Sequence, residues 1–311
     1  MPARDIIVIG ASAGGVDAIR KLVSGFSADL PAAIFVTIHV TAKSDGVLPA
    51  LITSASPLIA AHPKDGETIR TGRIYVAPPD FHLLIRHGHV HLGHGPRENL
   101  QRPCINAMFR SAASAYGERV AGVLLTGLLD DGAAGLWEIQ QNHGATIVQE
   151  PEEATFRSMP ESAIRGLNVQ YIVRLAQMAP LLTRLAMTSE NQPPPPTIQT
   201  SSEERTTQTC PECGGVMTAR SMGALVEYRC HTGHRFGIRT LLDQKAKNIE
   251  RLLEMALAQS EELSAALQSA MHNPDGEDTD SLRQEMERRE REQELLRRIS
   301  GNPDDPAQDR D

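Results

Sequence analysis

The segment Gly10-Ala11-Ser12-Ala13-Gly14 constrains the fold of this 311-residue chain more than any other. Asp5 and the apolar, β-branched residues 6–9 precede it, and this run predicts a buried strand. Residues 16–23 after it have apolar side chains at helical spacing. The glycines permit a sharp turn from strand to helix with Ser12 at its apex. This G-x-S-x-G pattern is typical of a nucleophile elbow, in which a helix N-terminus directs free N–H groups toward an anion.

Two other interpretations of this turn have to be weighed. A glycine-rich turn from strand to helix also binds the pyrophosphate of dinucleotides, usually with G-x-G-x-x-G spacing. Gly10, Gly14 and Gly15 do not fit that spacing, because Ser12 occupies the place of the second glycine. The turn could also be purely structural. Residues elsewhere in the chain must decide among the three.

Composition sets the broad class. Hydrophobic residues make up 40% and charged residues 23% of the chain, which is typical of a globular protein of about two domains. The sequence shows neither a secretory signal nor an apolar run long enough to span a bilayer, so we expect a cytoplasmic protein without membrane insertion. A net charge of −8 argues against a nucleic-acid partner.

Predicted strands and helices alternate through the first part of the chain. The strands are 5–10, 32–38, 74–77, 120–126, 145–149 and 169–173. The helices are 14–25, 45–54, 104–116, 132–142, 160–166 and 175–187. This order predicts an α/β fold with a doubly wound, mainly parallel sheet of the Rossmann-like type. Residues 81–85 and 89–93 interrupt the alternation and predict an antiparallel hairpin.

Composition also predicts the domain boundaries. We expect a catalytic domain over 1–188 and, over 189–207, an extended linker that contains four consecutive prolines. A small Cys/His module follows over 208–236. Helices then fill 237–300, as one helix over 238–271 and a second over about 282–299, and 301–311 is an acidic, disordered end. The helices could pair as a hairpin, associate with another chain as a homo-oligomer, or form a single solvated helix.

A serine nucleophile needs a base, and the base needs an acid that orients it. His39 follows the second predicted strand directly, so it should lie at the same sheet edge as Ser12. Asp130 and Asp131 follow the strand at 120–126. Either carboxylate could fix the tautomer of His39, or could cap the helix predicted at 132–142.

The ordered motifs of this segment resemble those of the CheB-type chemotaxis methylesterases, over residues 6 to about 185. They are Ile9–Gly15, Ile38-His39, Tyr75–Asp80, Arg102-Pro103, Phe109–Ala113, Leu125–Gly127, Asp131–Gly135 and Met159-Pro160. The order serine, histidine, aspartate also fits this family and not the α/β-hydrolases.

The resemblance implies a role for each matching residue. Ser12 corresponds to the nucleophile, His39 to the base and Asp131 to the acid of the triad. By position, the backbone N–H groups of Ala13 and Leu128 are candidates for the oxyanion hole. Two further candidates for contact with the substrate are Arg102, in the matching Arg-Pro motif, and His82, at a family-typical place where it would line the cleft.

The chain departs from the family pattern at three points. Gly127-Leu128-Leu129 stands where Gly-Met-Gly is frequent, and Asn106 stands where an aspartate is usual. The receiver domain that often precedes this catalytic domain is missing from the sequence, so we do not expect control by phosphorylation within this chain.

The implied activity is a serine hydrolase that removes methyl esters from glutamates of a methyl-accepting chemoreceptor or related signalling protein. Such an enzyme needs no cofactor, and family members can also deamidate glutamine. The alternative is a weakly catalytic or non-catalytic regulator that binds a partner through the Cys/His module and the helices. Nucleotide binding is disfavoured, because His39 stands where a ribose-binding acidic residue would.

The Cys/His module has the spacing of a zinc site. Cys210 and Cys213 form a C-x2-C knuckle, and after 16 intervening residues Cys230 and His234 follow as C-x3-H. We predict that these four residues hold a closed, structural zinc ion in a zinc-ribbon-like module, with His231 as a reserve ligand. The alternative is a set of unrelated free thiols.

The predicted hairpin is rich in histidine. Its histidines are His82, His87, His89, His91 and His94. A metal site would need three convergent ligands, and no neighbouring cysteine or carboxylate completes a set. We therefore expect a solvated hairpin without metal.

Overall fold

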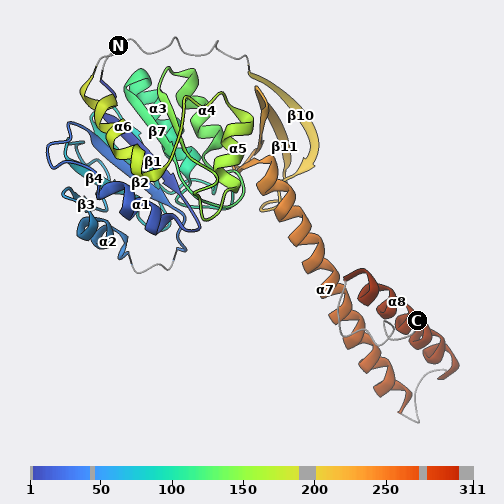
Figure 1. The fold of residues 1–311 in the computed structure, drawn as a ribbon. Coiled ribbons are helices and arrows are strands. Elements are labelled where there is room, and N and C mark those ends of the chain that lie inside the picture. The colour runs from blue at the N-terminus through green and yellow to red at the C-terminus, as the bar shows by residue number, and fades with distance from the viewer. Residues whose placement is uncertain (1–2, 43–45, 189–200, 273–278, 301–311) are drawn as a thin grey trace. The chain divides into compact units, whose positions relative to one another are not determined.

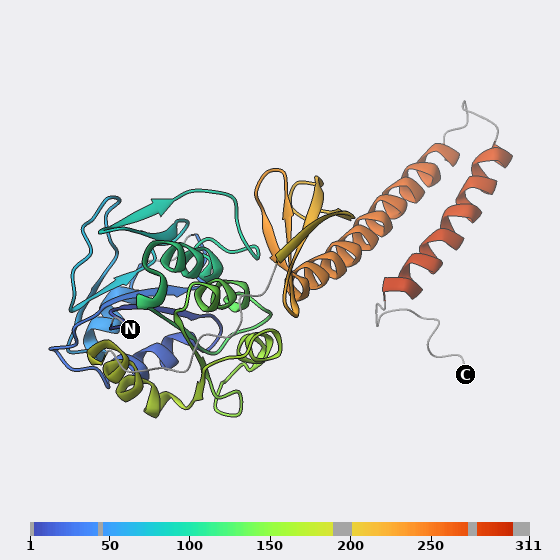
Figure 2. The same ribbon diagram turned by 90° about the horizontal axis from the view of Figure 1, so that it is seen from above.

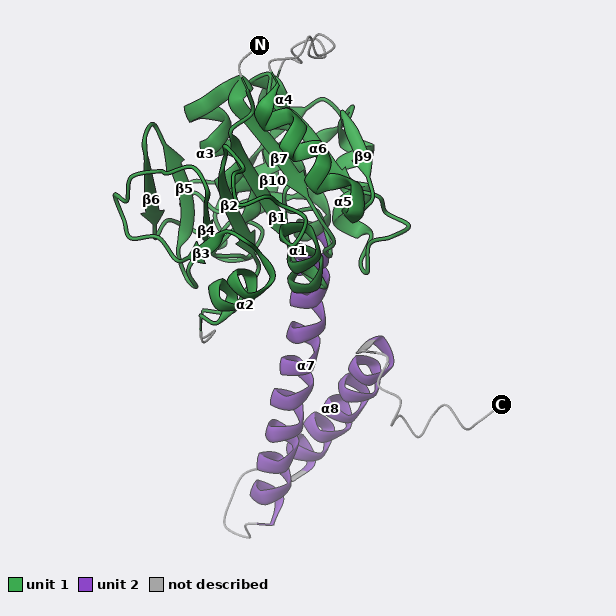
Figure 3. Cartoon of the chain, turned by 60° about the vertical axis from the view of Figure 1, so that its left-hand side comes forward, with its two compact units in different colours: residues 1–241 green, residues 242–311 purple. Residues whose placement is uncertain are grey.

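The computed structural model describes residues 3–42, 46–188, 201–272 and 279–300 (Figure 1). The chain forms two compact units, Met1–Leu241 and Leu242–Asp311 (Figure 3). The predicted catalytic domain and Cys/His module therefore belong to one unit. Residues 201–207, predicted as linker, lie in strand β10, and residues 189–200 are outside the described part.

The core of the first unit is a seven-stranded sheet in the order β3-β4-β2-β1-β7-β8-β9, and every neighbouring pair is parallel. Its strands are β1 (Ile6–Ala11), β2 (Ala33–Ile38), β3 (Ile59–Ala61), β4 (Arg73–Val76), β7 (Val120–Leu124), β8 (Ala145–Gln149) and β9 (Tyr171–Val173). The prediction of a mainly parallel sheet is confirmed. It missed β3, whose three residues are too few for a periodic signal.

The direction of strand addition reverses at β1. From β1 the chain proceeds outward through β2 and β4 on one side, and through β7, β8 and β9 on the other. All residues of β1 and β2 are buried, which explains why these strands read as continuous apolar runs. In an open α/β sheet the functional crevice lies at such a reversal, at the carboxyl ends of the strands.

Helices cover both faces of the sheet (Figures 1 and 2). One face carries α1 (Gly15–Val23), α2 (Leu48–Ala55) and α6 (Leu175–Met187). The other carries α3 (Ile105–Tyr116), α4 (Ala133–Gln141) and α5 (Ser158–Gly166). Alternate residues of β1 pack into the hydrophobic cores on the two faces of the sheet. Ile7 and Ile9 lie on the first face, and Ile6 and Val8 lie on the second.

The predicted hairpin is present as β5 (His82–Arg86) and β6 (His89–Gly93), a separate two-stranded antiparallel sheet. Leu83, Ile85 and Val90 are buried in the core that contains α3. A short 3-10 helix, η1 (Gly117–Arg119), leads from α3 into β7.

The Cys/His module is a four-stranded antiparallel sheet in chain order. Its strands are β10 (Ser201–Thr209), β11 (Val216–Met222), β12 (Leu225–Cys230) and β13 (Arg235–Gly237). Met222 is buried within the α3–α5 core, and the Leu225 side chain lies against Gly166 of α5. The module thus shares apolar contacts with the parallel-sheet part of the unit, so the predicted boundary does not separate two compact bodies.

The second unit is a helical hairpin. Helix α7 (Ile238–Met271) begins in the first unit and continues through the second, where α8 (Thr279–Ser300) pairs with it. The Gln293 amide of α8 donates to the Ser260 carbonyl of α7 at 2.9 Å, and Arg297 donates to Glu261 at 2.8 Å. The predicted end 301–311 is outside the described residues. Within the described part, no helix has both the length and the apolar character needed to cross a membrane.

A substitution at Gly10 would test the close packing of α3 on β1. A Cβ atom at this position would stand 2.2 Å from Ile105 Cγ2. We expect Gly10→Ala to lower the free energy of unfolding by about 1–3 kcal/mol, because the core cannot expand without strain. Gly95→Ala is the matched control, since nothing lies within 4 Å of its Cβ position. Equal urea midpoints for the two variants would contradict this expectation.

Candidate active site

Three side chains meet at the carboxyl edge of the sheet. Ser12 follows β1, His39 follows β2, and Asp131 lies in the loop between β7 and α4. The Ser12 backbone N–H donates to the Thr126 carbonyl at 3.0 Å, and the His39 N–H donates to the Ala11 carbonyl at 3.3 Å. Backbone hydrogen bonds between neighbouring strands therefore fix the backbone positions of Ser12 and His39.

The three predicted side chains form a continuous hydrogen-bonded chain. His39 Nδ1 lies 3.0 Å from Ser12 Oγ, and His39 Nε2 lies 2.7 Å from Asp131 Oδ2. Asp131 is 2% exposed. The structure thus brings together the serine, the imidazole and the carboxylate that the sequence predicts.

The charge of Asp131 determines the tautomer of His39. Burial alone would raise the pKa of Asp131, but hydrogen bonds from His39 and the Ile105 N–H, together with the charge of His39, lower it to about 2. An ionised carboxylate can only accept hydrogen bonds. Nε2 must therefore carry a proton, and in the neutral ring Nδ1 is free to accept the proton of Ser12.

Asp131 lies at the N-terminus of α3. Its Oδ2 accepts from the Ile105 N–H at 2.8 Å, and its Oδ1 accepts from the Asn106 N–H at 3.2 Å. The Asn99 amide donates to Oδ1 at 3.0 Å, and the Cys104 thiol donates to it at 3.1 Å. These donors and the positive end of the helix dipole stabilise a buried negative charge that would otherwise be costly.

Asp130 and Asn106 cap two other helices. The Asn106 side-chain oxygen accepts from the Gly132 and Gly135 N–H groups at 2.9 and 2.7 Å, so it caps α4. Asp130 accepts from the Arg239 N–H at 2.9 Å and from the Thr240 hydroxyl at 2.5 Å, so it caps α7. Asp131 also accepts from the Gly132 N–H at 3.0 Å, so the capping alternative considered above applies in part to Asp131. The side-chain hydrogen bonds of Asp130 go to the start of α7 instead. Asn106, at the position that departs from the family pattern, has that structural role.

The two predicted oxyanion positions lie beside Ser12. Ala13 lies two residues before the first residue of α1, and the Thr126 hydroxyl donates to its carbonyl at 3.0 Å. Leu128 is 52% exposed and follows Gly127, where a Cβ atom would stand 2.8 Å from Ser12 Cβ. No hydrogen bond from the N–H of Ala13 or Leu128 to another described residue is present. Both groups are therefore free to donate to a ligand.

Leu129, which stands where the family often has the second glycine of Gly-Met-Gly, has an unusual backbone conformation. Leu129 has φ of +65°, in the left-handed region that favours glycine. Its carbonyl accepts hydrogen bonds from the hydroxyls of Ser158 and Ser162 at 3.1 and 3.0 Å. These bonds from α5 hold Leu129 in a conformation that a glycine would adopt at lower cost.

Arg102 and His82 make structural contacts. Arg102 donates from two nitrogens to Asp80 Oδ1 at 3.0 and 2.7 Å and from a third to the Gly95 carbonyl at 2.8 Å. His82 is buried, and its Nε2 lies 3.0 Å from the Pro96 carbonyl. Both side chains support the loop between β6 and α3, and neither has a hydrogen bond to Ser12, His39 or Asp131 in the described structure.

The hairpin histidines have separate partners. His91 lies 2.8 Å from Asp65, and His94 lies 2.9 Å from Asp80. His89 contacts the His87 carbonyl at 3.0 Å. Within the described residues, the only cluster of three or more potential ligands is the one in the Cys/His module.

That cluster consists of Cys210, Cys213, Cys230 and His234, whose ligand atoms all lie within 4.8 Å of one another. The Sγ atoms of Cys213 and Cys230 are 3.6 Å apart, and His234 Nδ1 is 3.5 Å from Cys230 Sγ and 3.7 Å from Cys210 Sγ. A tetrahedral zinc with bonds of about 2.3 Å to sulfur and about 2.0–2.1 Å to nitrogen requires separations of about 3.5–3.8 Å. The four residues therefore fit a tetrahedral metal, and His231 is not in the cluster.

The surroundings of the cluster also suit a metal. His234 Nε2 lies 2.9 Å from a carboxylate oxygen of Glu212, which fixes the ring with Nδ1 toward the thiols. Hydrogen bonds from the Thr232 hydroxyl and the Gly215 N–H lower the pKa of Cys213 to about 6, whereas burial raises that of Cys210 to about 11. A thiolate is thus already favoured at one of the ligands.

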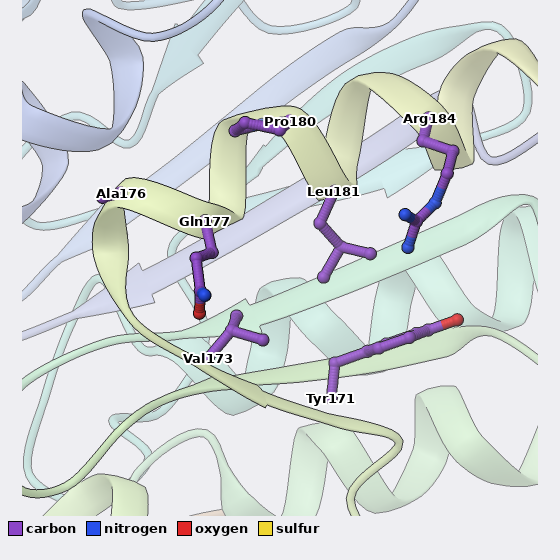
Figure 4. A pocket seen from close by; sticks show the side chains of 7 residues that line it. All are labelled: Tyr171, Val173, Ala176, Gln177, Pro180, Leu181 and Arg184. Carbon is purple, nitrogen blue, oxygen red and sulfur yellow. The ribbon is translucent and has the colours of Figure 1, made fainter.

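A pocket elsewhere has no part in this site. Figure 4 shows a pocket of about 370 Å³ between β9 and α6, lined by Tyr171, Val173, Ala176, Gln177, Pro180, Leu181 and Arg184. It lies at the β9 edge of the sheet, three strands away from β1. These lining residues include no serine, cysteine, histidine or carboxylate, so a nucleophile with its base and acid is found at the edge that carries Ser12.

The ionisation of Asp131 predicts a pH-dependent contribution to stability. Its pKa is about 2 in the folded protein against an ordinary value of 3.8, so the contribution is complete above about pH 4 and is lost as the pH falls toward 2. We expect the difference in unfolding free energy between the wild type and Asp131→Asn to decrease by about 2 kcal/mol over this range. Urea unfolding at a series of pH values measures it. A difference that stays constant with pH would contradict the assignment.

Comparisons with known proteins agree with this geometry. Residues 7–182 match the family described as CheB methylesterase. A protein of Leptospira interrogans, named as a putative protein-glutamate methylesterase/protein-glutamine glutaminase, is 36% identical over 182 residues, which cover 58% of this chain and 94% of that protein. A protein-glutamate methylesterase/protein-glutamine glutaminase of Methanosarcina mazei is 32% identical over 190 residues, which are 52% of its length.

A solved structure has the same fold. The crystal structure of the Thermotoga maritima CheB methylesterase catalytic domain superimposes with a TM-score of 0.56 at 28% identity, covering 60% of this chain and 99% of that domain. Residues 7–182, which match the family, contain the three side chains at the carboxyl edge of the sheet. The chain belongs to the CheB methylesterase family.

Proposed function

We propose that this protein is a serine hydrolase that removes methyl esters from glutamate side chains of a chemoreceptor-type signalling protein. One observation carries the proposal: Ser12 Oγ, the His39 ring and Asp131 form an unbroken hydrogen-bonded chain with separations of 3.0 and 2.7 Å. The names of the relatives supply protein glutamate methyl esters as the substrate class, and the resemblance to the CheB-type chemotaxis methylesterases supplies the receptor. The chain spans about half the length of the Methanosarcina relative, so the substrate and partner are inferred from the shared domain alone.

The geometry suggests the first half of the reaction. Ser12 Oγ attacks the ester carbonyl while its proton passes to His39 Nδ1. Asp131 keeps the second ring proton on Nε2 and stabilises the positive ring that forms. The N–H groups of Ala13 and Leu128 then donate to the oxyanion, each contributing about 10²–10³ in rate if they act as in other acyl transfer enzymes.

The second half regenerates the enzyme. His39 returns the proton to the leaving methoxide, so methanol departs and a glutamyl ester of Ser12 remains. A water molecule that His39 deprotonates attacks this ester and releases the glutamate carboxylate and Ser12. The same steps on a glutamine side chain would release ammonia, which is the glutaminase activity in the names of the relatives. No step requires a cofactor.

We assign zinc to the Cys/His cluster as a structural ion. Cys210, Cys213, Cys230 and His234 would fill all four positions of a tetrahedral site, which leaves none for a substrate. The buried apolar core of the module is small, with Met217, Phe236 and Leu241 as its main members. Its fold would therefore depend on the ion.

The helical unit is the part best suited to bind a partner. Leu242, Ile249 and Leu263 recur at multiples of seven residues along α7, and Leu242 and Ile249 are 59% and 60% exposed. Such a stripe favours association with other helices, including those of a second copy. This observation also supports the alternative, in which the chain is a weakly catalytic regulator that acts through its partner.

Substitution of the nucleophile separates the two functions. We expect Ser12→Ala to reduce methanol release from a methylated receptor fragment by at least about 10⁴-fold, because no other group can form the acyl-enzyme. Circular dichroism and the thermal midpoint should stay close to those of the wild type. Undiminished methanol release by this variant would exclude the mechanism, and an inactive wild type would favour the regulator.

Metal analysis tests the zinc assignment. We expect about one zinc per purified chain, and less than stoichiometric metal in Cys213→Ser, because the site then lacks one of its four ligands. Cys104→Ser is the matched control, since this buried thiol lies outside the cluster. Metal-free wild-type protein with an unchanged thermal midpoint would rule out a structural ion.

A further inference from the structure

The last strand of the Cys/His module borders the segment that contacts the acid of the active site. Glu98 forms a parallel bridge with Arg235, the first residue of β13. Asn99 and Leu100 both have positive φ, at +50° and +64°. Left-handed backbone at two consecutive non-glycine residues is strained, so surrounding contacts must hold it in place.

Asn99 connects the module to Asp131 directly. The Asn99 backbone N–H donates to the Arg235 carbonyl at 2.7 Å, and its side-chain oxygen accepts from the Gly237 N–H at 2.8 Å. Its side-chain nitrogen donates to Asp131 Oδ1 at 3.0 Å. Asn99 is 4% exposed. The buried Asn99 side chain thus binds the end of β13 through its oxygen and the Asp131 carboxylate through its nitrogen.

A second connection runs through Asp130. Its carboxylate caps the first turn of α7, and the Gly237 backbone packs so closely that a Cβ there would stand 2.3 Å from Asp130 Oδ2. Because Asp130 directly precedes Asp131, the start of α7 fixes the loop that carries the acid. The adjacent aspartates are therefore held by the same end of the module.

Charged side chains reinforce the same contact. Arg110 of α3 donates to Glu98 at 2.5 Å and lies 4.0 Å from Glu227 of β12. Arg235 of β13 donates to Glu227 at 2.5 Å and lies 3.9 Å from Glu98. The Glu98 and Glu227 side chains are 11% and 5% exposed. Buried ion pairs of this kind lose stability when one partner is removed, so β12 and β13 are firmly attached to α3.

We propose that the Cys/His module is a positioning element of the active site, which holds Asp131 in place through Asn99 and Asp130, so that the esterase depends on a folded module. The inference rests on the proposed function. Asn99 is a positioning residue, since it acts through Asp131 and Asp131 through His39. The metal of the module would then control activity without taking part in the chemistry.

The test uses the full chain and Asn99→Asp, which keeps the acceptor for Gly237 and replaces the donor to Asp131 by a carboxylate oxygen. Aspartate also tolerates positive φ. We expect kcat to fall by about tenfold or more with little change in KM, because a hydrogen bond to a charged group is lost. The titratable groups facing Asp131 are His39, Cys104 and Asp130. A further negative charge among them favours the protonated ring, so the acidic limb of the rate profile should move to higher pH.

Asn99→Gly is a second variant at the same position, and Arg220→Ala is the control variant within the module. Glycine suits the left-handed backbone at position 99 and removes both side-chain bonds, so Asn99→Gly should fold and also lose kcat. Arg220 of β11 contacts Glu138 at 2.7 Å and lies over the Trp137 ring, on a part of the module that does not lead to Asp131. We expect Arg220→Ala to lower the thermal midpoint while kcat and the pH profile stay those of the wild type.

Metal removal tests the dependence on folding. Trp137 is the single tryptophan of the chain, is 3% exposed and contacts the module, so its emission reports docking. After chelation of wild-type protein we expect a red shift of the emission and a parallel loss of kcat. Wild-type kcat in protein whose Trp137 is exposed would overturn the inference.

The outcomes distinguish this inference from the proposed function. An active wild type with an unchanged rate and pH profile in both Asn99 variants would overturn the positioning role alone. Equal loss of kcat in Arg220→Ala and the Asn99 variants would also overturn it, because the effect would then be general destabilisation. A wild type that releases no methanol would contradict the proposed function itself.

Discussion

A buried, ionised carboxylate is the constraint on which this active site depends. Asp131 is 2% exposed and has a pKa of about 2, so its charge must be balanced by donors inside the protein. His39, Asn99, Cys104 and the first N–H groups of α3 supply them. Each of these donors comes from a different part of the chain or from a helix terminus. The charge can be stabilised only when β2, the loop before α3 and α3 itself are all in place.

The same edge of the sheet contains a set of crossed helix caps. Asp131 caps α3, Asn106 of α3 caps α4, and Asp130 caps α7. Unpaired N–H groups at a helix start need acceptors, and here distant side chains provide them. Asp130 and Asp131 lie in the loop before α4, and Asn106 lies in the first turn of α3. The caps therefore connect α3, α4 and α7 to one another. The positions of Ser12, His39 and Asp131 are thereby linked to the packing of three helices.

The Cys/His module extends this network beyond the family domain, whose match ends at residue 182. Met222 enters the core beneath α3 to α5, and Gly237 and Arg235 bind Asn99. The module is therefore part of the first compact unit, although a proline-rich segment precedes it in sequence. A segment that follows the family domain can in this way reach Asp131, the proposed acid of the triad.

Much of the fold and of the site could be predicted from the sequence. The apolar runs at 5–10, 32–38 and 120–126 identify the central strands, because strands buried on both faces must be apolar throughout. The parallel order then brings the residues after these strands to one edge, which indicates Ser12, His39 and either Asp130 or Asp131. The family resemblance then assigned the acid to Asp131. The spacing of Cys210, Cys213, Cys230 and His234 likewise indicated the cluster that the structure contains.

The partners of polar side chains could not be predicted in the same way. Asn99 and Asn106 have no distinctive local pattern, and Asp130 caps a helix 109 residues later in the chain. Local sequence determined which segments became strands, helices and metal-binding knuckles, since those depend on neighbouring residues. Only the tertiary structure decided which donor meets which carboxylate, because a buried charge selects its partners by proximity in space and not along the chain.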